Sequence, residues 1–150
     1  MYKTIVTRRV RSMYAAMNEG DHRPLLDCFD RDFTYTFVGE NHPLAGTRRT
    51  RATMEAQLQR VLRLFPGIRF TVRDVLINGM PWNTRIGISI GVRARLQDGS
   101  QYENDIVQLL RMRWGRVTRV HTVIDTGRLE AAFGRLAAAG IEEATASPVS

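Results

Sequence analysis

A long run of alternating residues near the end of the chain constrains its fold more than any other feature. Residues 102–125 read YENDIVQLLRMRWGRVTRVHTVID, which predicts two β-strands joined by a tight turn at Trp114-Gly115. Period-two geometry places apolar side chains on the same face as two amides, Asn104 and Gln108. Apolar walls with a few polar groups are typical of a ligand pocket, so this face is predicted to line one.

The same alternation runs through the residues that precede this stretch. Ile68, Phe70, Val72 and Leu76 alternate with polar residues and lead to a predicted turn at Asn78-Gly79-Met80-Pro81. Asp98-Gly99 predicts a hairpin between the next strand and the one that starts near Gln101. The intervening strand should bury one face, made of Ile86, Ile88, Ile90, Val92, Ala94 and Leu96. Together these strands predict an antiparallel meander.

The first half of the chain has helical spacing instead. Apolar residues from Val6 to Met17 predict a helix ended by Gly20, and Pro24 to Phe29 predict a short second helix. A third helix is expected over residues 50–65, after a short strand at Phe33–Val38 and a loop at 39–46. Leu129, Phe133 and Leu136 indicate a short C-terminal helix. This order predicts an α+β fold in which helices pack on one face of the sheet.

The length of 150 residues suits one domain, which we expect over residues 1–139, with a disordered small-residue tail at 140–150. No run approaches the roughly 18 apolar residues of a membrane span, and the N-terminus does not read as a signal peptide. We therefore expect no membrane association and a cytoplasmic location. Cys28 is the sole cysteine, so no internal disulfide can form.

The net charge of +7 comes almost entirely from arginine, and it raises the question of nucleic acid. The arginines are scattered along the chain and no RNA-binding or zinc-finger motif is present, so the sequence argues against a nucleic-acid partner. His22, His42 and His121 do not have metal-ligand spacing. We expect no metal and no organic cofactor.

The element order resembles the nuclear-transport-factor-two-like cone fold, which ketosteroid isomerases, limonene epoxide hydrolases and SnoaL-like polyketide cyclases share. The residues that carry this resemblance are Gly20-Asp21, Gly46, Tyr102-x-Asn104, Trp114-Gly115-Arg116-Val117 and Asp125. The resemblance covers about residues 6 to 137. It implies a cone-shaped, curved antiparallel sheet packed by three N-terminal helices and a C-terminal helix, a cystatin-like α+β roll.

The resemblance also implies a catalytic position. Asp125 falls where SnoaL-like cyclases have their general acid/base. The isomerase base would lie within Phe33–Val38, which holds no carboxylate, and the isomerase oxyanion-hole acid would align near Val107 or Gln108. The Arg-x-Asp pair of the epoxide hydrolases has no counterpart around Arg85. The chain therefore keeps one of these acid/base positions.

His121 lies four residues before Asp125, so both side chains should share a face, and we predict them as the catalytic pair. Asp125 equally suits an N-cap, because Asp125-Thr126-Gly127 precedes the last helix, and His121 equally suits a hydrogen-bonded sheet residue. Asn104 and Gln108 can likewise satisfy backbone groups instead of a ligand. The residues predicted to bind a ligand are Asn104, Gln108, Tyr35, Tyr14, Trp82, Tyr102 and Ile106.

Two functions follow from these patterns. The first is a cofactor-independent isomerase or cyclase that uses Asp125 for acid/base chemistry on a hydrophobic carbonyl compound. The second is a non-catalytic ligand-binding or accessory module of the same fold. Both imply a small hydrophobic ligand. The convex face of the meander is left open, so we also expect a homodimer.

Overall fold

The computed structural model describes residues 1–150 and has the predicted order of elements, with one short strand and one 3-10 helix added. These elements are α1 (Tyr2–Asn18), α2 (Arg23–Asp27), β1 (Phe29–Phe37), β2 (Gly46–Arg48), α3 (Arg51–Leu64), β3 (Arg69–Met80), β4 (Asn83–Arg95), β5 (Gln101–Arg113), β6 (Arg116–Ile124), α4 (Thr126–Ala138) and the 3-10 helix η1 (Glu142–Thr145). None of the helices combines the length and hydrophobicity that a membrane crossing requires.

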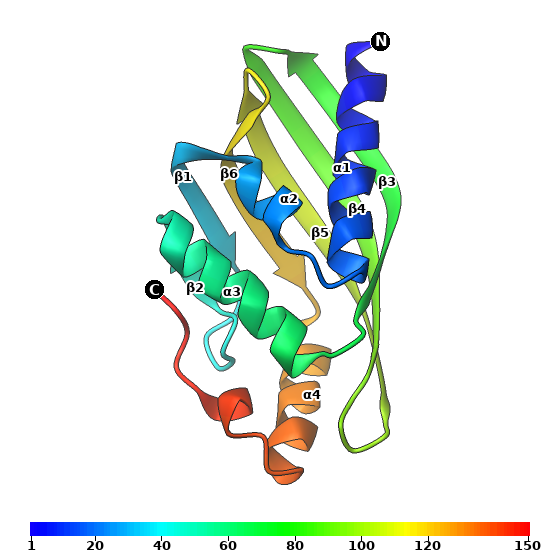
Figure 1. The fold of residues 1–150 in the computed structure, drawn as a ribbon, viewed down its shortest axis with the longest axis vertical. Helices are drawn as coiled ribbons and strands as arrows, with labels where there is room; N and C mark the ends of the chain where they lie inside the picture. Colours follow the sequence, from blue (N-terminus) through cyan, green and yellow to red (C-terminus); the bar gives the residue numbers. More distant parts are fainter.

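The strands form one six-stranded sheet in the order β2-β1-β6-β5-β4-β3 (Figure 1). The four long strands β3 to β6 make the predicted antiparallel meander. The sheet is mixed, because β1 lies parallel to β6 beside this antiparallel meander. The chain reaches β6 from β1 only after β2, α3 and three further strands, so no tight turn forces β1 to run against it.

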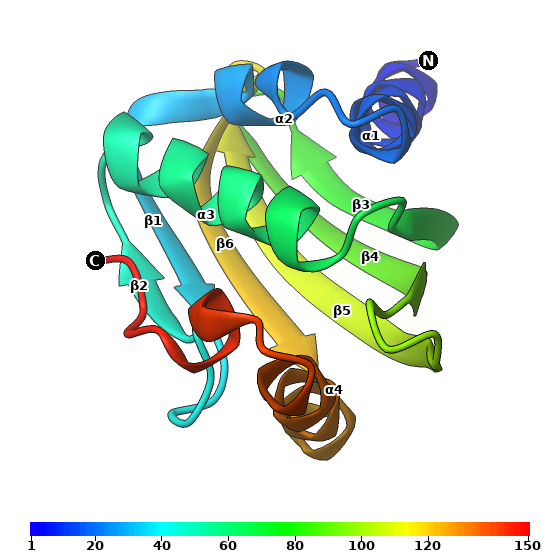
Figure 2. The same cartoon turned by 60° about the horizontal axis from the view of Figure 1, so that its bottom comes forward.

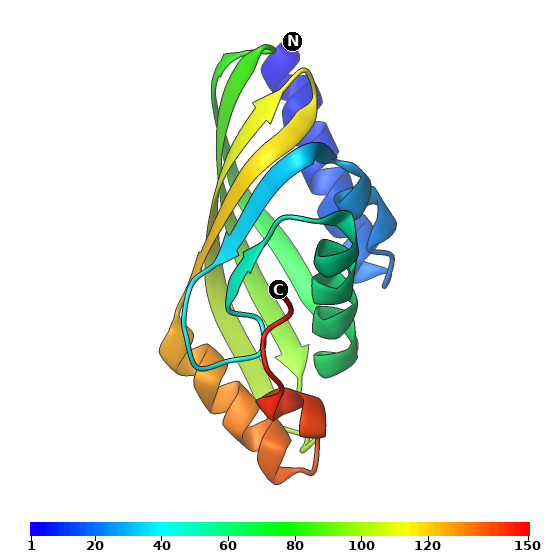
Figure 3. The same cartoon turned by 90° about the vertical axis from the view of Figure 1, so that its left-hand side faces the viewer.

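The sheet is curved and unclosed, and its concave side faces the helices. Figures 2 and 3 show α1, α2 and α3 on this side and α4 beyond the end of β6. The predicted alternation is confirmed in β4 and β5, where every second side chain from Ile86 to Ala94 and from Tyr102 to Met112 is buried. The concave face and the helices bury one continuous apolar cluster of 33 residues.

Side-chain hydrogen bonds fix the helices on the sheet. Asn18 at the end of α1 donates to the Phe70 carbonyl at 2.9 Å and accepts from the Phe70 amide at 2.7 Å, which joins α1 to the start of β3. Thr50 caps α3 by accepting a hydrogen bond from the Thr53 amide. The second helix is shorter than predicted, because Phe29 begins β1 and packs against Phe33 at 4.6 Å between ring centroids.

The loop between β1 and β2 is held by His42, which is 4% exposed. Its Nε2 donates to the Val38 carbonyl at 2.8 Å, and its Nδ1 accepts from the Leu44 amide at 3.2 Å. The ring stacks on Phe133 of α4 at 6.0 Å. Burial lowers the pKa of His42, which favours the neutral tautomer that these two bonds require.

The segment after Gly140, expected to be disordered, contains η1 in the structure. Glu143 accepts hydrogen bonds from Arg60 at 3.2 Å and from Arg63 at 2.7 Å, and Ala144 is buried. These arginines lie on α3, so the contact that orders residues 142–145 joins parts of the chain that are far apart in sequence.

Candidate functional site

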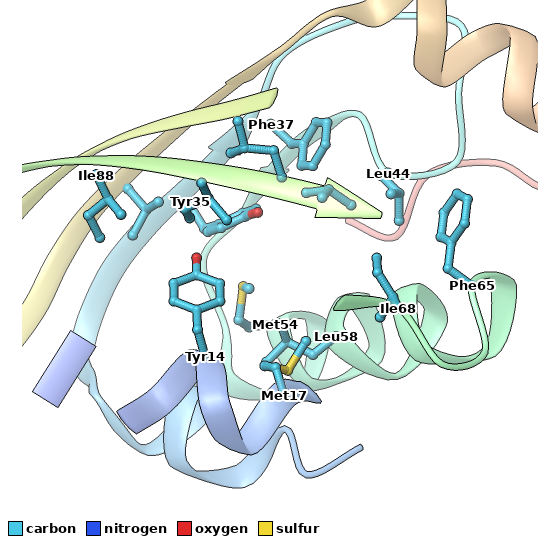
Figure 4. Close-up of a cluster of buried hydrophobic side chains, with 14 of the residues drawn as sticks. Tyr14, Met17, Tyr35, Phe37, Leu44, Met54, Leu58, Phe65, Ile68 and Ile88 are labelled. Atoms are coloured by element: carbon cyan, nitrogen blue, oxygen red, sulfur yellow. The ribbon is translucent and has the colours of Figure 1, made fainter. Parts of the chain in front are cut away.

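A small internal cavity of about 80 Å³ lies between the concave face of the sheet and the helices. Figure 4 shows side chains from α1 and α3, among them Met17, Met54 and Leu58, on one side and side chains from the sheet on the other. The wall is almost entirely apolar, and its polar members are Tyr14, Tyr35, Tyr102, Gln108 and Thr122. Such a wall suits an apolar ligand that carries few polar groups.

Four polar side chains at one end of the cavity form a directed chain of hydrogen bonds. Tyr14 donates to Gln108 Oε1 at 2.5 Å, and Gln108 Nε2 donates to Thr122 Oγ1 at 3.1 Å. Thr122 in turn donates to the Tyr35 hydroxyl at 3.2 Å. In Figure 4 the Tyr14 hydroxyl points toward Tyr35. The chain ends at Tyr35, whose own hydroxyl hydrogen is donated to no protein group.

Burial keeps these tyrosine hydroxyls protonated. Burial raises the pKa of Tyr14 far above its usual value, and it also raises the pKa of Tyr35. Both residues are therefore hydrogen-bond donors at all physiological pH values. A protonated donor in a buried, largely apolar site binds a carbonyl or an anionic oxygen better than the same group does in water.

A second polar pair joins β5 to the start of α4. Asn104 Nδ2 donates to the Tyr102 hydroxyl at 2.8 Å and to the Asp125 carbonyl at 3.0 Å, while Asn104 Oδ1 accepts from the Asp105 amide. Burial raises the pKa of Tyr102 to about 12. Tyr102 and Ile106 line the cavity, whereas Asn104 is buried outside its wall and is hydrogen-bonded to Tyr102 and to two backbone groups.

Asp125 lies outside the cavity and caps α4. Its carboxylate accepts from the Arg128 amide at 3.1 Å and lies 3.6 Å from Arg128 Nε, and its side chain is 57% exposed. The expectation that Asp125 projects into an apolar pocket is therefore not met. The capping position is favoured over a buried one, because there the carboxylate accepts a hydrogen bond from a free amide of the first helical turn and stays in water.

We expect Asp125→Ala to lower the free energy of unfolding by about 1 kcal/mol through loss of this cap. Asp125→Asn should leave stability nearly unchanged, because asparagine caps helices about as well as aspartate. Chemical denaturation of the two variants measures this difference. Equal losses from Ala and Asn would contradict the capping role.

His121 and Trp82 also lie away from the cavity. His121 is on the convex face of β6, next to an open groove of about 730 Å³ whose other walls include Leu76, Gly87 and Leu109. Trp82 is 53% exposed at the β3–β4 turn, where its ring lies 6.1 Å from that of Trp114. We place the candidate site in the smaller cavity because most of its wall is buried, whereas the groove lies on the exposed convex face of the sheet.

Thr122 was not predicted from the sequence, and the structure places it in the hydrogen-bond chain. A register shift between β5 and β6 changes which side chains of β6 point inward, so Val120, Thr122 and Ile124 face the core. One feature of the sequence does indicate that His121 faces outward. Arg119, two residues earlier on the same strand, is a charged residue on the same outward face. Predicted residues that do meet at the cavity are Tyr14, Tyr35, Tyr102, Ile106 and Gln108.

The match to a family model decides the relationship of this chain to known proteins. The model of the SnoaL-like domain matches residues 10–120, about three quarters of the 150 residues. The chain belongs to the SnoaL-like domain family. A search of curated proteins finds no match.

Solved structures support the same fold. TerC, crystallised with polyporic acid, shares 22% identity and a TM-score of 0.69 over 87% of this chain and 95% of that one. A nuclear-transport-factor-two-like protein from Burkholderia pseudomallei gives 20% identity, a TM-score of 0.73, and coverage of 84% and 95%. A protein from Xanthomonas campestris with a cystatin-like fold gives 22% identity and a TM-score of 0.68, over 84% of this chain and 95% of that one. The SnoaL-like fold is therefore a cystatin-like α+β roll.

The SnoaL-like match includes Tyr14, Tyr35 and Gln108 but ends before Thr122 and Asp125. The structure brings together no group of three or more His, Cys, Asp or Glu side chains that could hold a metal ion. The ionisable side chains of the cavity wall are tyrosines alone. This SnoaL-like cavity therefore offers hydrogen-bond donors and apolar contacts, and its wall contains no carboxylate or imidazole.

Proposed function

We propose that this SnoaL-like protein binds a compact, apolar molecule that carries one hydrogen-bond-accepting oxygen. The observation that carries the proposal is the chain from Tyr14 to Tyr35, which leaves one buried hydroxyl hydrogen free. A buried donor without an acceptor is costly, and a ligand oxygen would supply the acceptor. The apolar remainder of the wall would bind the body of the ligand.

The cavity volume limits the ligand to a small body. A volume of about 80 Å³ is well below the roughly 300–1,000 Å³ of sites for drug-sized molecules. A second hollow of about 30 Å³ shares Tyr14, Leu25, Tyr35 and Gln108 with the first. The flexible side chains of Met17 and Met54 in the wall can also make room. We therefore expect a single-ring compound.

The test is the binding of acetophenone, a single-ring ketone, measured by calorimetry. We expect Tyr35→Phe to weaken binding about two- to tenfold, because one neutral hydrogen bond contributes about 0.5–1.5 kcal/mol. Tyr2→Phe is the matched control, since the Tyr2 hydroxyl bonds Thr84 outside the cavity. The proposal is contradicted if acetophenone does not bind to the wild type, or if the two variants weaken its binding equally.

Acid/base catalysis is the second candidate, and the protonated hydroxyls of Tyr14 and Tyr35 favour it. The free hydroxyl hydrogen of Tyr35, in a chain that begins at Tyr14, would stabilise the negative oxygen of an enolate. The base would have to come from outside the cavity wall, and Asp125 is the residue that the family resemblance suggests. If any turnover is found, an unchanged rate in Asp125→Asn excludes that residue. The cytoplasmic location stays a prediction.

We also propose that a second copy of the chain covers the convex face of the sheet. Four apolar side chains are exposed there: Leu76 (72%), Leu109 (56%), Val107 (46%) and Val123 (41%). They lie on β3, β5 and β6, three strands of one continuous sheet surface. A contiguous apolar patch of this kind is typical of an interaction site.

Light scattering at high micromolar concentration should give a dimer for the wild type and a monomer for Leu109→Glu. The carboxylate would lose its hydration in the dimer and keep it in the monomer. Ile5→Glu is the control, because Ile5 has the same exposure, 56%, but lies on α1. A monomeric wild type refutes the proposal.

A further inference from the structure

Arg48 on β2 is a buried cation that makes no ion pair. The residue is 1% exposed, and its guanidinium donates to three backbone carbonyls: Leu44 at 2.9 Å, Gly46 at 3.0 Å and Ala45 at 2.7 Å. No carboxylate lies within 4.0 Å of it. The Nε–H is buried and has no acceptor. The carbonyls satisfy the guanidinium in part and leave its charge uncompensated.

Arg48 is the cross-strand neighbour of Tyr35, a residue of the cavity wall. Arg48 and Tyr35 are register partners on adjacent antiparallel strands, and both side chains are buried on the same face of the sheet. The carbonyl of Leu44, a residue of the wall, accepts from Arg48 and also from Gln57 Nε2 at 3.0 Å. Gln57 Oε1 is likewise buried without a partner.

A buried charge acts further than an exposed one, because neither water nor salt screens it. The guanidinium stays protonated even though burial lowers its pKa. Burial raises the pKa of Tyr35, while the hydrogen bond from Thr122 and the nearby charge of Arg48 act in the opposite direction. The charge of Arg48 likewise favours negative charge on any oxygen that Tyr35 binds.

We propose that Arg48 determines ligand specificity by making the cavity select an organic acid, bound as its anion with the ionised oxygen on the Tyr35 hydroxyl. This inference rests on the proposed function and names the charge of its ligand. Arg48 acts through the wall, as a positioning residue, and does not touch the ligand. Phenols, enols and carboxylic acids share the required chemistry.

The experiment uses 4-nitrophenol, whose phenolate absorbs visible light, with 4-nitroanisole as its neutral counterpart and benzoate as the carboxylate. A pH titration of 4-nitrophenol with excess protein gives the pKa of the bound probe. We expect this pKa to be about one pH unit lower in the wild type than in Arg48→Gln, because both proteins share the desolvation that the cavity imposes and differ only in the charge. One unit corresponds to about tenfold tighter binding of phenolate relative to phenol. Benzoate binding tells whether carboxylates are accepted as well.

Arg48→Gln should weaken the preference for phenolate about tenfold, while 4-nitroanisole binds as before. The matched control is Arg49→Gln, which removes a neighbouring exposed arginine and should leave the preference unchanged. Arg48→Lys keeps the charge and should keep most of the preference. If Arg48→Gln does not fold, the preference for phenolate is measured on the wild type at about 1 M salt. The Debye length is then about 3 Å, so exposed charges are screened and buried ones are not. A persisting preference supports a buried charge, and its loss points to surface arginines and overturns the inference.

The outcomes separate this inference from the function on which it rests. If 4-nitroanisole and 4-nitrophenol bind equally at every pH, the selection of anions is wrong and the apolar cavity remains. If Arg49→Gln and Arg48→Gln change the preference alike, Arg48 has no special role. If neither probe binds to the wild type, the inference and the proposed function both fail.

Discussion

Replacing Gln108 by leucine should lower the free energy of unfolding by about 1–3 kcal/mol, because it leaves the buried Tyr14 hydroxyl without an acceptor. Gln108 accepts from Tyr14 and donates to Thr122, and it is 8% exposed. Each buried polar group that loses its partner costs about 1–3 kcal/mol. Chemical denaturation measures the loss, provided that the slope with denaturant stays constant.

A double-mutant cycle separates this hydrogen bond from the packing of the side chains. The Tyr14→Phe, Gln108→Leu double variant removes both partners, so it should be about 0.5–3 kcal/mol more stable than the sum of the single losses predicts. Tyr2→Phe combined with Gln108→Leu serves as the control and should be additive, because Tyr2 bonds Thr84 instead. Additive losses in the Tyr14 cycle would show that the bond contributes nothing to stability.

A second large loss, about 2–4 kcal/mol, is expected for Gly79→Ala, since backbone strain alone costs about 1–3 kcal/mol. Gly79 has φ +99°, and a Cβ there would lie 2.2 Å from the Asn83 carbonyl oxygen of the facing strand. Both atoms belong to the backbone of one hairpin, so no side-chain rotation relieves the clash. The end of the β3–β4 hairpin would have to shift.

Gly87→Ala is the matched control in the neighbouring strand. A Cβ at Gly87 would have no neighbour closer than 4.0 Å, so the change should alter stability by no more than about 0.5 kcal/mol. Thermal and chemical denaturation of the two variants compare them directly. A Gly79→Ala protein as stable as Gly87→Ala would show that the hairpin relaxes without strain.

The predicted turn at residues 78–81 shows where local sequence reasoning stops. Asn78-Gly79 is a strong turn signal, yet β3 continues through Met80, and the turn is at Pro81 and Trp82. Gly79 instead takes its positive φ inside the ladder, opposite Thr84. The dipeptide predicts a positive φ correctly but does not tell a turn from a strained position within a strand.

The candidate site was predictable in part. Period-two alternation placed Gln108, Tyr102 and Ile106 on the inner face of β5, because that period follows from strand geometry alone. The inner face of β6 was not predictable, since a shift in its pairing with β5 changes which residues point inward. The same local pattern therefore suggested His121 where the structure places Thr122.

The sequence by itself determined the α+β class, the order of the elements and the meander of four long strands, because periods of 3.6 and 2 residues are local properties of helices and strands. Only the tertiary structure decided that Asp125 caps α4, that β1 pairs parallel with β6, and that Arg48 is buried beside Tyr35. Each of these depends on which distant groups share a hydrogen bond or a buried environment. No local period encodes such contacts, and they fix the chemistry of the cavity.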